Sequence, residues 1–143
     1  MQTKVKDLMT EEPVIIDRET TLEEAAREMK SVDCGVLPIG SWHVLEGIIT
    51  DRDIVVRAVA EGADMATEQV RDYMTTEVFY CDEDDTLAEA AEKMHKYGVS
   101  RLIVNDNGGR ACGIITFGCI LRKNKSLREI GQVVECAVGK KVA

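Results

Sequence analysis

Four polar residues follow one another in the segment GIITDRDI, residues 47–54. We expect a strand to end near Thr50 and a helix to begin beside it, and the first N–H groups of a helix have no partners within that helix. These N–H groups, the Thr50 hydroxyl and the Arg52 cation could bind a phosphate. The Asp53 carboxylate follows one turn later and offers two acceptor oxygens, which suit the paired hydroxyls of a ribose. The segment therefore contains the donors and acceptors of a nucleotide site.

The same segment also permits a purely structural interpretation. Asp51 or Asp53 could cap the first turn of the helix, because acidic side chains accept hydrogen bonds from its free N–H groups and interact favourably with the helix dipole. A threonine followed three residues later by an aspartate is a weak motif by itself, so both interpretations stay open.

The composition argues against several other kinds of protein. The chain has 143 residues, of which 45% are hydrophobic and 31% charged, as is typical of a globular protein. Its net charge of −8 argues against binding to nucleic acid or to an anionic membrane surface, which requires a basic face. No apolar run approaches the roughly 18–20 residues that span a bilayer. We therefore expect a cytoplasmic protein with neither a nucleic-acid nor a membrane partner.

Residues suited to metal binding or catalysis are scarce. The five cysteines are an odd number and form no CxxC pair, so we expect neither a disulfide framework nor a metal site. His43 and His95 are the two histidines, and His95 suits the negative end of a helix dipole. Asp51 and Asp53 would diverge by roughly 200° around a helix, which does not suit an acid–base pair. We therefore expect no catalytic residues and no enzymatic activity.

A long internal repeat surrounds the first motif. Residues 5–29 align without gaps with residues 70–94, and 12 of these 25 positions are identical. GIITDRDI itself returns as GIITFGCI, residues 113–120, with the charges of its DRD replaced by Phe-Gly-Cys. Identity at this density indicates two copies of one structural unit.

The pattern within one copy predicts the order of its elements. A short β-rich run precedes TLEEAAREM, residues 21–29, whose apolar residues recur at helical spacing. Thr21 and Glu24 fit a capping box at the start of this helix, as Thr86 and Glu89 do in the second copy. Two apolar strands and a second helix, ending at Gly62, complete a β-α-β-β-α unit. We expect units at 1–64 and 65–125, followed by an amphipathic helical tail at 126–143.

The repeat and its motifs together resemble a tandem pair of CBS domains, named after cystathionine β-synthase. The resemblance covers essentially residues 1–125 and rests on the VxDxMT lead-in, the TLxEAAxxM helix, the GVLPI strand and the closing GIITDRD. It implies a mixed α/β (α+β) fold in which two βαββα units pack sheet to sheet as a pseudo-twofold pair. Family members commonly form dimers and bind adenosine compounds in clefts between the units, so we expect a homodimer.

The resemblance assigns roles at the positions that match the family pattern. The threonine of the closing motif contacts phosphate and the aspartate binds ribose hydroxyls, which corresponds to Thr50 and Asp53. The adenine side of the cleft comes from the other unit. The predicted ligand-binding residues are Ile48, Thr50, Arg52, Asp53, Thr75, Val78, Phe79, Val99, Ser100 and Arg101.

The second cleft is expected to be degenerate. Cys119 stands at its ribose-binding position and is only a weak hydrogen-bond acceptor. We expect this cleft to bind weakly, or to be closed by the packing of Phe117 and Cys119. A redox role for Cys34 and Cys119 is a further alternative. The residues of this cleft are Thr10, Cys34, Gly35, Ile114, Thr116 and Cys119.

The sequence thus predicts a regulatory module that binds an adenosine-containing ligand and signals by a conformational change. AMP and ATP are favoured over S-adenosylmethionine and NAD(H), with no obligatory cofactor. The alternative is a structural or dimerisation scaffold without a ligand. The sequence does not identify a regulated protein partner.

Overall fold

The computed structural model describes residues 2–138. The chain divides into two compact units, which we describe separately. The central unit is Pro13–Val78, and the terminal unit combines the described parts of Met1–Glu12 and Phe79–Ala143. This division differs from the expected boundary after residue 64, because the lead-in of each repeat packs with the body of the other repeat.

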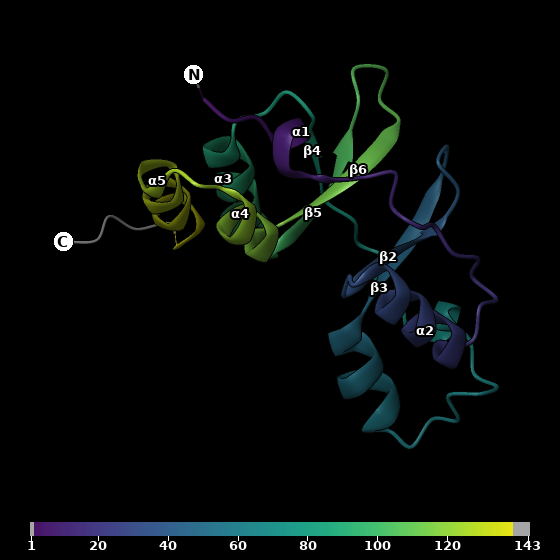
Figure 1. The fold of residues 1–143 in the computed structure, drawn as a ribbon. Coiled ribbons are helices and arrows are strands. Elements are labelled where there is room, and N and C mark those ends of the chain that lie inside the picture. The colour runs from purple at the N-terminus through teal and green to yellow at the C-terminus, as the bar shows by residue number, and fades with distance from the viewer. Residues whose placement is uncertain (1, 139–143) are drawn as a thin grey trace. The chain divides into compact units, whose positions relative to one another are not determined.

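In the central unit, a helix packs against a small antiparallel sheet (Figure 1). Strand β2 (Val36–Gly40) pairs with β3 (Leu45–Thr50), and both carry a buried apolar run. Helix α2 (Leu22–Val32) covers them with one apolar face, as its sequence period predicts. At its start only the hydroxyl half of the expected capping box is formed, in which Thr21 Oγ1 accepts from the Glu24 N–H at 3.1 Å.

Two isolated bridges extend this sheet at its edges. Ile16 pairs in parallel with Ile39, and Thr75 pairs in antiparallel fashion with Ile48. The helix expected after β3 is the π-helix η1 (Asp53–Val59), and a short 3₁₀ helix, η2 (Val70–Asp72), precedes Thr75.

The terminal unit repeats this arrangement with two additional short strands. Its four-stranded sheet has the order β1-β6-β5-β4, in which β4 and β5 are parallel and the other neighbours antiparallel. The elements are α1 (Val5–Leu8), β1 (Thr10–Glu11), β4 (Tyr80–Asp82), α3 (Leu87–Tyr97), β5 (Arg101–Asn105), β6 (Ala111–Thr116), α4 (Phe117–Lys123) and α5 (Leu127–Val138). At the start of α3 the full capping box forms between Thr86 and Glu89.

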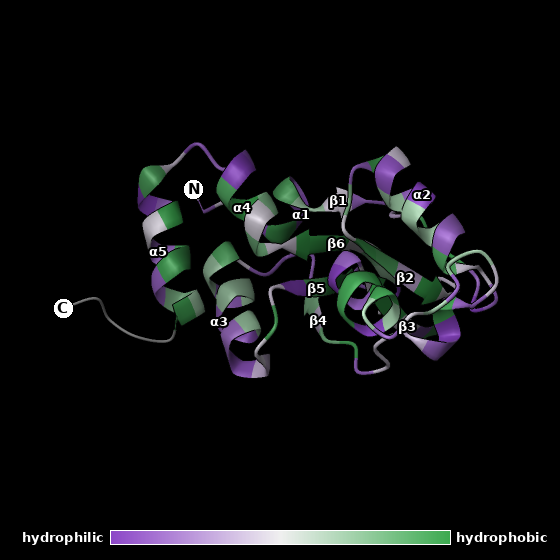
Figure 2. Cartoon of the chain, turned by 90° about the horizontal axis from the view of Figure 1, so that it is seen from below, coloured by the Kyte–Doolittle hydropathy of each residue, from purple (hydrophilic) through white to green (hydrophobic). Residues whose placement is uncertain are grey.

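Helix α5 is the observed part of the expected tail, and residues 139–143 of that tail lie outside the described residues. It packs against α3, and its residue Val133 is buried in the same core cluster as residues of α3 (Figure 1). Figure 2 shows the division between apolar and polar faces on α3 and α5, whereas β6 is largely hydrophobic. From β4 to α4 the terminal unit has the predicted β-α-β-β-α order. In the central unit, the isolated bridge at Ile16 stands in place of the first strand and the π-helix η1 in place of the last α-helix. Both units have the expected mixed α/β character. Within residues 2–138, no helix is both long enough and apolar enough to cross a bilayer.

Candidate functional site

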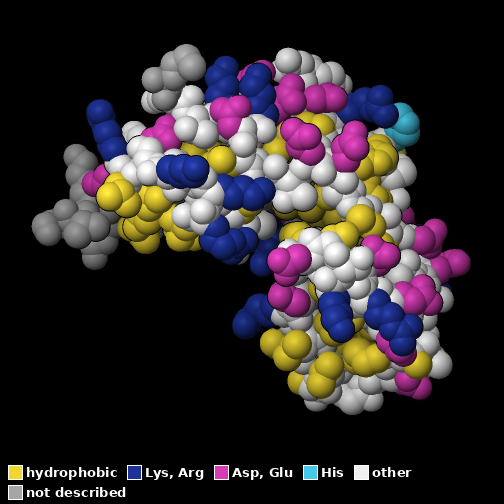
Figure 3. All heavy atoms as spheres, in the orientation of Figure 1, with side chains coloured by type: hydrophobic (Ala, Val, Ile, Leu, Met, Phe, Trp, Pro, Cys, Tyr) yellow, Lys and Arg dark blue, Asp and Glu magenta, His cyan; other side chains and the backbone are white. Residues whose placement is uncertain are grey.

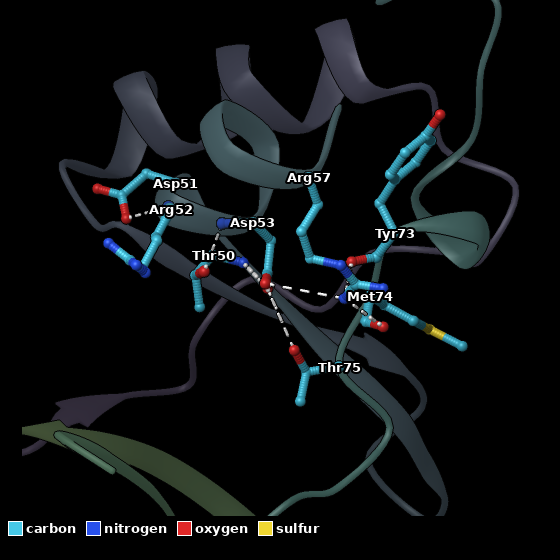
Figure 4. Close-up of polar contacts among 8 residues, drawn as sticks. All are labelled: Thr50, Asp51, Arg52, Asp53, Arg57, Tyr73, Met74 and Thr75. Atoms are coloured by element: carbon cyan, nitrogen blue, oxygen red, sulfur yellow. Dashed lines mark hydrogen bonds and ion pairs between the residues drawn. The ribbon is translucent and has the colours of Figure 1, made fainter. Parts of the chain in front are cut away.

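The junction between β3 and η1 is closed by two reciprocal hydrogen bonds (Figure 4). The Asp53 N–H donates to Thr50 Oγ1 at 3.0 Å, and the Thr50 N–H donates to Asp53 Oδ2 at 3.0 Å. Thr50 is only 4% exposed and is the one buried polar residue among those that the structure describes. The threonine and aspartate of the motif are therefore held in one fixed geometry.

The Asp53 carboxylate also faces the segment that bridges to β3. Thr75 Oγ1 lies 3.4 Å from Asp53 Oδ2 and 3.5 Å from Oδ1. Ile48 and Thr75 exchange backbone hydrogen bonds of 2.8 and 2.9 Å, which fix Thr75 at this position. Four of the predicted site residues, Ile48, Thr50, Asp53 and Thr75, thus come together within the central unit.

Arg57 is a member of this cluster that the predicted site did not include. Its Nη1 donates to the carbonyl of Tyr73 at 2.8 Å and to that of Met74 at 3.3 Å. The same nitrogen lies 3.9 Å from Asp53 Oδ1. The sequence contained one signal that could have identified Arg57. Arg57 lies four residues after Asp53, a spacing that places both side chains on one face of a helix.

Asp51 and Arg52 point away from this cluster (Figure 4). The Asp51 carboxylate instead accepts from the Arg52 N–H at 2.8 Å, and both side chains are exposed. The carboxylate also lies beside Gly35, where an added Cβ would stand 2.7 Å from Asp51 Oδ2. Gly35 therefore belongs to the central unit with Asp51, and its lack of a side chain leaves room for that carboxylate.

The other predicted ligand-binding residues are divided between the two units. Val78 ends the central unit and is half-buried. Phe79 begins the second stretch of the terminal unit, where its ring stacks on Tyr97 with centroids 4.3 Å apart. In the terminal unit, Val99 and Ser100 directly precede β5, and Arg101 is its first residue.

The second copy of the junction keeps the threonine and loses the carboxylate. Thr116 Oγ1 accepts from the Cys119 N–H at 3.0 Å, as Thr50 does from Asp53. Cys119 is 5% exposed, and its thiol donates to the carbonyl of Leu8 at 3.3 Å. Lys123 donates to the same carbonyl at 3.3 Å, in the place that corresponds to Arg57. The Cys119 thiol is therefore buried and already hydrogen-bonded within the terminal unit.

The remaining residues assigned to the second cleft are also divided. Thr10 pairs with Ile114 between β1 and β6 in the terminal unit. Cys34 lies in the central unit and donates to the carbonyl of Val36 at 3.4 Å. Cys34 and Cys119 thus belong to different units.

The two copies of the repeat match a known family. A profile of the CBS domain matches residues 5–59 and again residues 70–126. The chain belongs to the CBS domain family. The two matches correspond to the two copies of the repeat, so the protein is a tandem CBS pair.

Two proteins of similar length resemble this chain along most of its sequence. The CBS domain-containing protein YhcV of Bacillus subtilis is 31% identical over 132 residues, which cover 92% of this chain and 93% of YhcV. Hypoxic response protein 1 of Mycobacterium tuberculosis is 31% identical over 122 residues, or 84% of each chain.

Two solved structures show a similar fold. The CBS pair of protein MJ0100, in complex with 5′-methylthioadenosine and S-adenosylmethionine, is 32% identical, with a TM-score of 0.73 over 85% of this chain and 95% of that one. Hypoxic response protein 1 with two coordinated zinc ions has a TM-score of 0.70 at 31% identity, over 85% of this chain and 99% of that one. In the described part of this CBS pair, no three His, Cys, Asp or Glu side chains are grouped so as to hold a metal ion.

Proposed function

We propose that this CBS pair is a regulatory module that binds an adenosine-containing ligand through the Thr50–Asp53 junction. The observation that carries the proposal is the position of the Asp53 carboxylate. Its Oδ2 accepts a hydrogen bond of ordinary length, 3.0 Å, from the Thr50 N–H, whereas its Oδ1 has only partners at 3.5 Å and 3.9 Å. Oδ1 therefore keeps the capacity to accept a hydrogen bond from a ribose hydroxyl.

The surrounding residues suit the rest of such a ligand. The Thr75 hydroxyl beside the carboxylate can turn to a ligand, because its contacts with Asp53 are long. The Arg52 side chain points away from this cluster, so its role toward a phosphate stays a prediction from the sequence. The solved pair of MJ0100 with adenosine compounds supports this ligand class. The roles of Phe79 and of residues 99–101 toward the base stay predictions from the family resemblance.

The two copies support one competent site per chain. Cys119 offers a buried sulfur that is already bonded to Leu8, in place of the two carboxylate oxygens of Asp53. A thiol is a weak acceptor and cannot replace a carboxylate toward a diol. We therefore propose a single strong adenosine site in each chain.

Regulation would follow from a difference in ligand affinity between two conformations of the pair. A ligand shifts a conformational equilibrium only by the amount of this difference. Assembly as a homodimer stays a prediction of the sequence, which identifies no regulated partner.

A thermal-shift panel of AMP, ADP, ATP, S-adenosylmethionine and NAD(H) tests the ligand class. A ligand at 100 times its Kd should raise the apparent stability by about 2.7 kcal/mol. We expect one adenosine ligand to produce this shift in the parent and not in Asp53→Ala, with one equivalent bound per chain by calorimetry. Two equivalent sites, or equal shifts in both proteins, would contradict the proposal.

A ligand-free scaffold is the second candidate function, and one observation favours it. The Asp53 carboxylate has internal partners in Thr50, Thr75 and Arg57, so a structural role explains part of its position. If no adenosine compound shifts the parent in the same panel, this scaffold function replaces the regulatory one.

A further inference from the structure

The turn between α4 and α5 concentrates positive charge in an acidic protein. Residues 122–128 read RKNKSLR and contain four of the 18 Lys and Arg residues, without an Asp or Glu among them. The aligned stretch of the first copy, residues 56–62, reads VRAVAEG and contains one cation. This basic turn is therefore specific to the second copy and is not part of the motif that defines the adenosine site.

The basic turn lines a hollow in the terminal unit. The hollow has a volume of about 780 Å³ and lies between the N-terminal arm and the start of α5. This volume is in the range of about 300–1,000 Å³ that small-molecule sites occupy. Its lining residues are Gln2, Thr3, Leu8, Lys123, Asn124, Lys125, Ser126, Arg128, Glu129 and Gln132.

The one acidic residue of the lining is already bonded within the protein. Glu129 accepts from the Thr3 N–H at 2.8 Å, from Thr3 Oγ1 at 2.7 Å and from Asn124 Nδ2 at 3.0 Å. These hydrogen bonds lower the pKa of Glu129, and the bond from the Thr3 backbone has the largest effect. Its charge is thus engaged in holding the N-terminal arm against α5.

The cations of the lining have no acidic partner in the part of the chain that the structure describes. None of the ion pairs among residues 2–138 includes Lys123, Lys125 or Arg128. All three are exposed, and the Lys123 amine has the Leu8 carbonyl as its hydrogen-bond partner. Figure 3 shows Lys and Arg side chains gathered over the region of α4 and the turn that follows it. The amides of Gln2 and Gln132 add neutral donors to the lining.

We propose that this hollow binds a small compound with two or more adjacent phosphate groups. Lys and Arg side chains form strong charge-assisted hydrogen bonds with phosphate oxygens, and Arg can bind two of them at once. A compact polyanion would meet three cations in a concave, polar site. The concave shape and the net charge of −8 favour a small molecule over a nucleic acid.

Calorimetry of the full chain with inorganic triphosphate tests this site. We expect one equivalent to bind, and the double variant Lys125→Gln/Arg128→Gln to lose affinity by about tenfold or more, because two charged hydrogen bonds are removed. Arg122→Gln is the matched control, since Arg122 belongs to the same basic turn but does not line the hollow. It should change the affinity by less than about threefold, as expected for screened surface charge.

Repeating the titration with Asp53→Ala distinguishes binding in the hollow from binding at the proposed adenosine site. This variant should bind triphosphate with the same affinity as the parent. ATP should displace triphosphate from this variant if the hollow accepts the phosphate tail of a nucleotide. Failure to displace it would support a site for free inorganic polyphosphate. No binding of triphosphate by the parent, or equal losses in the double variant and in Arg122→Gln, would overturn the proposal. Urea midpoints of all variants verify that they are folded.

Discussion

Replacing Asp53 with alanine and with asparagine separates the two roles that its carboxylate can have. Alanine removes the acceptor for the Thr50 N–H, which lies 3.0 Å from Oδ2, and the loss of such a cap typically costs about 1 kcal/mol. It also removes the 3.9 Å contact with Arg57, whose side chain is 48% exposed, so this pair adds only about 0.3–0.5 kcal/mol. The long contacts with Thr75 add little. We expect Asp53→Ala to lose about 1–2 kcal/mol of unfolding free energy.

Asparagine keeps one carbonyl oxygen, which can still accept from the Thr50 N–H. Asp53→Asn should therefore lose only about 0.5 kcal/mol, mainly through the pair with Arg57. A ribose diol, by contrast, needs the charge and the second acceptor oxygen. Hydrogen bonds to charged groups are worth about 1.5–3 kcal/mol, so Asp53→Asn should bind its adenosine ligand at least about tenfold more weakly than the parent.

Urea unfolding without ligand and calorimetry with the adenosine ligand measure the two quantities. The ligand-binding interpretation requires a variant that is nearly as stable as the parent and yet binds poorly. Equal affinity of Asp53→Asn and the parent would refute the ribose role. An Asp53→Ala variant as stable as the parent would refute the capping role, because the hydrogen bond at 3.0 Å would then contribute nothing.

Three further changes test other parts of the structure. Gly47→Ala should cost about 1–3 kcal/mol in urea unfolding, because its Cβ would lie 2.7 Å from a backbone oxygen. Gly35→Ala should cost clearly less, since its Cβ meets an exposed carboxylate that can rotate away. The lowered pKa of Glu129 contributes stability above roughly pH 4.3 that is lost as pH falls through the folded-state pKa. Urea midpoints between pH 6 and pH 3 should therefore fall less for Glu129→Gln than for the parent. Burial raises the pKa of Cys81 to about 12, so at pH 8 iodoacetamide should label it far more slowly in the folded than in the unfolded protein, as mass spectrometry can show.

Sequence patterns correctly predicted the helices whose formation depends on neighbouring residues in the chain. Helices α2 and α3 begin after Thr21 and Thr86, because a threonine cap and the apolar spacing of TLxEAAxxM act within one or two turns. The expected helix after β3 formed as the π-helix η1, and apolar periodicity does not specify that hydrogen-bond pattern.

Contacts between distant segments were harder to predict. The bridge between Ile48 and Thr75 joins residues far apart in the sequence and assigns the lead-in of the second repeat to the central unit. The direction of Arg57 depends on that pairing, because its acceptors are carbonyls of the same lead-in. The sequence identified Thr50 and Asp53 by type and spacing, but it could not show the neighbours of the carboxylate.

The second copy acts as an internal control for the role of Asp53. Both junctions keep the threonine that accepts a hydrogen bond from the third residue after it, and in both a cation bonds to a lead-in carbonyl. The second junction has Cys119 in place of the aspartate, and the Cys119 thiol donates to the carbonyl of Leu8. The junction therefore forms without a carboxylate, and capping alone does not explain why the first copy carries one. A ligand with a diol would make use of the acceptor oxygen of Asp53 that has only long contacts inside the protein.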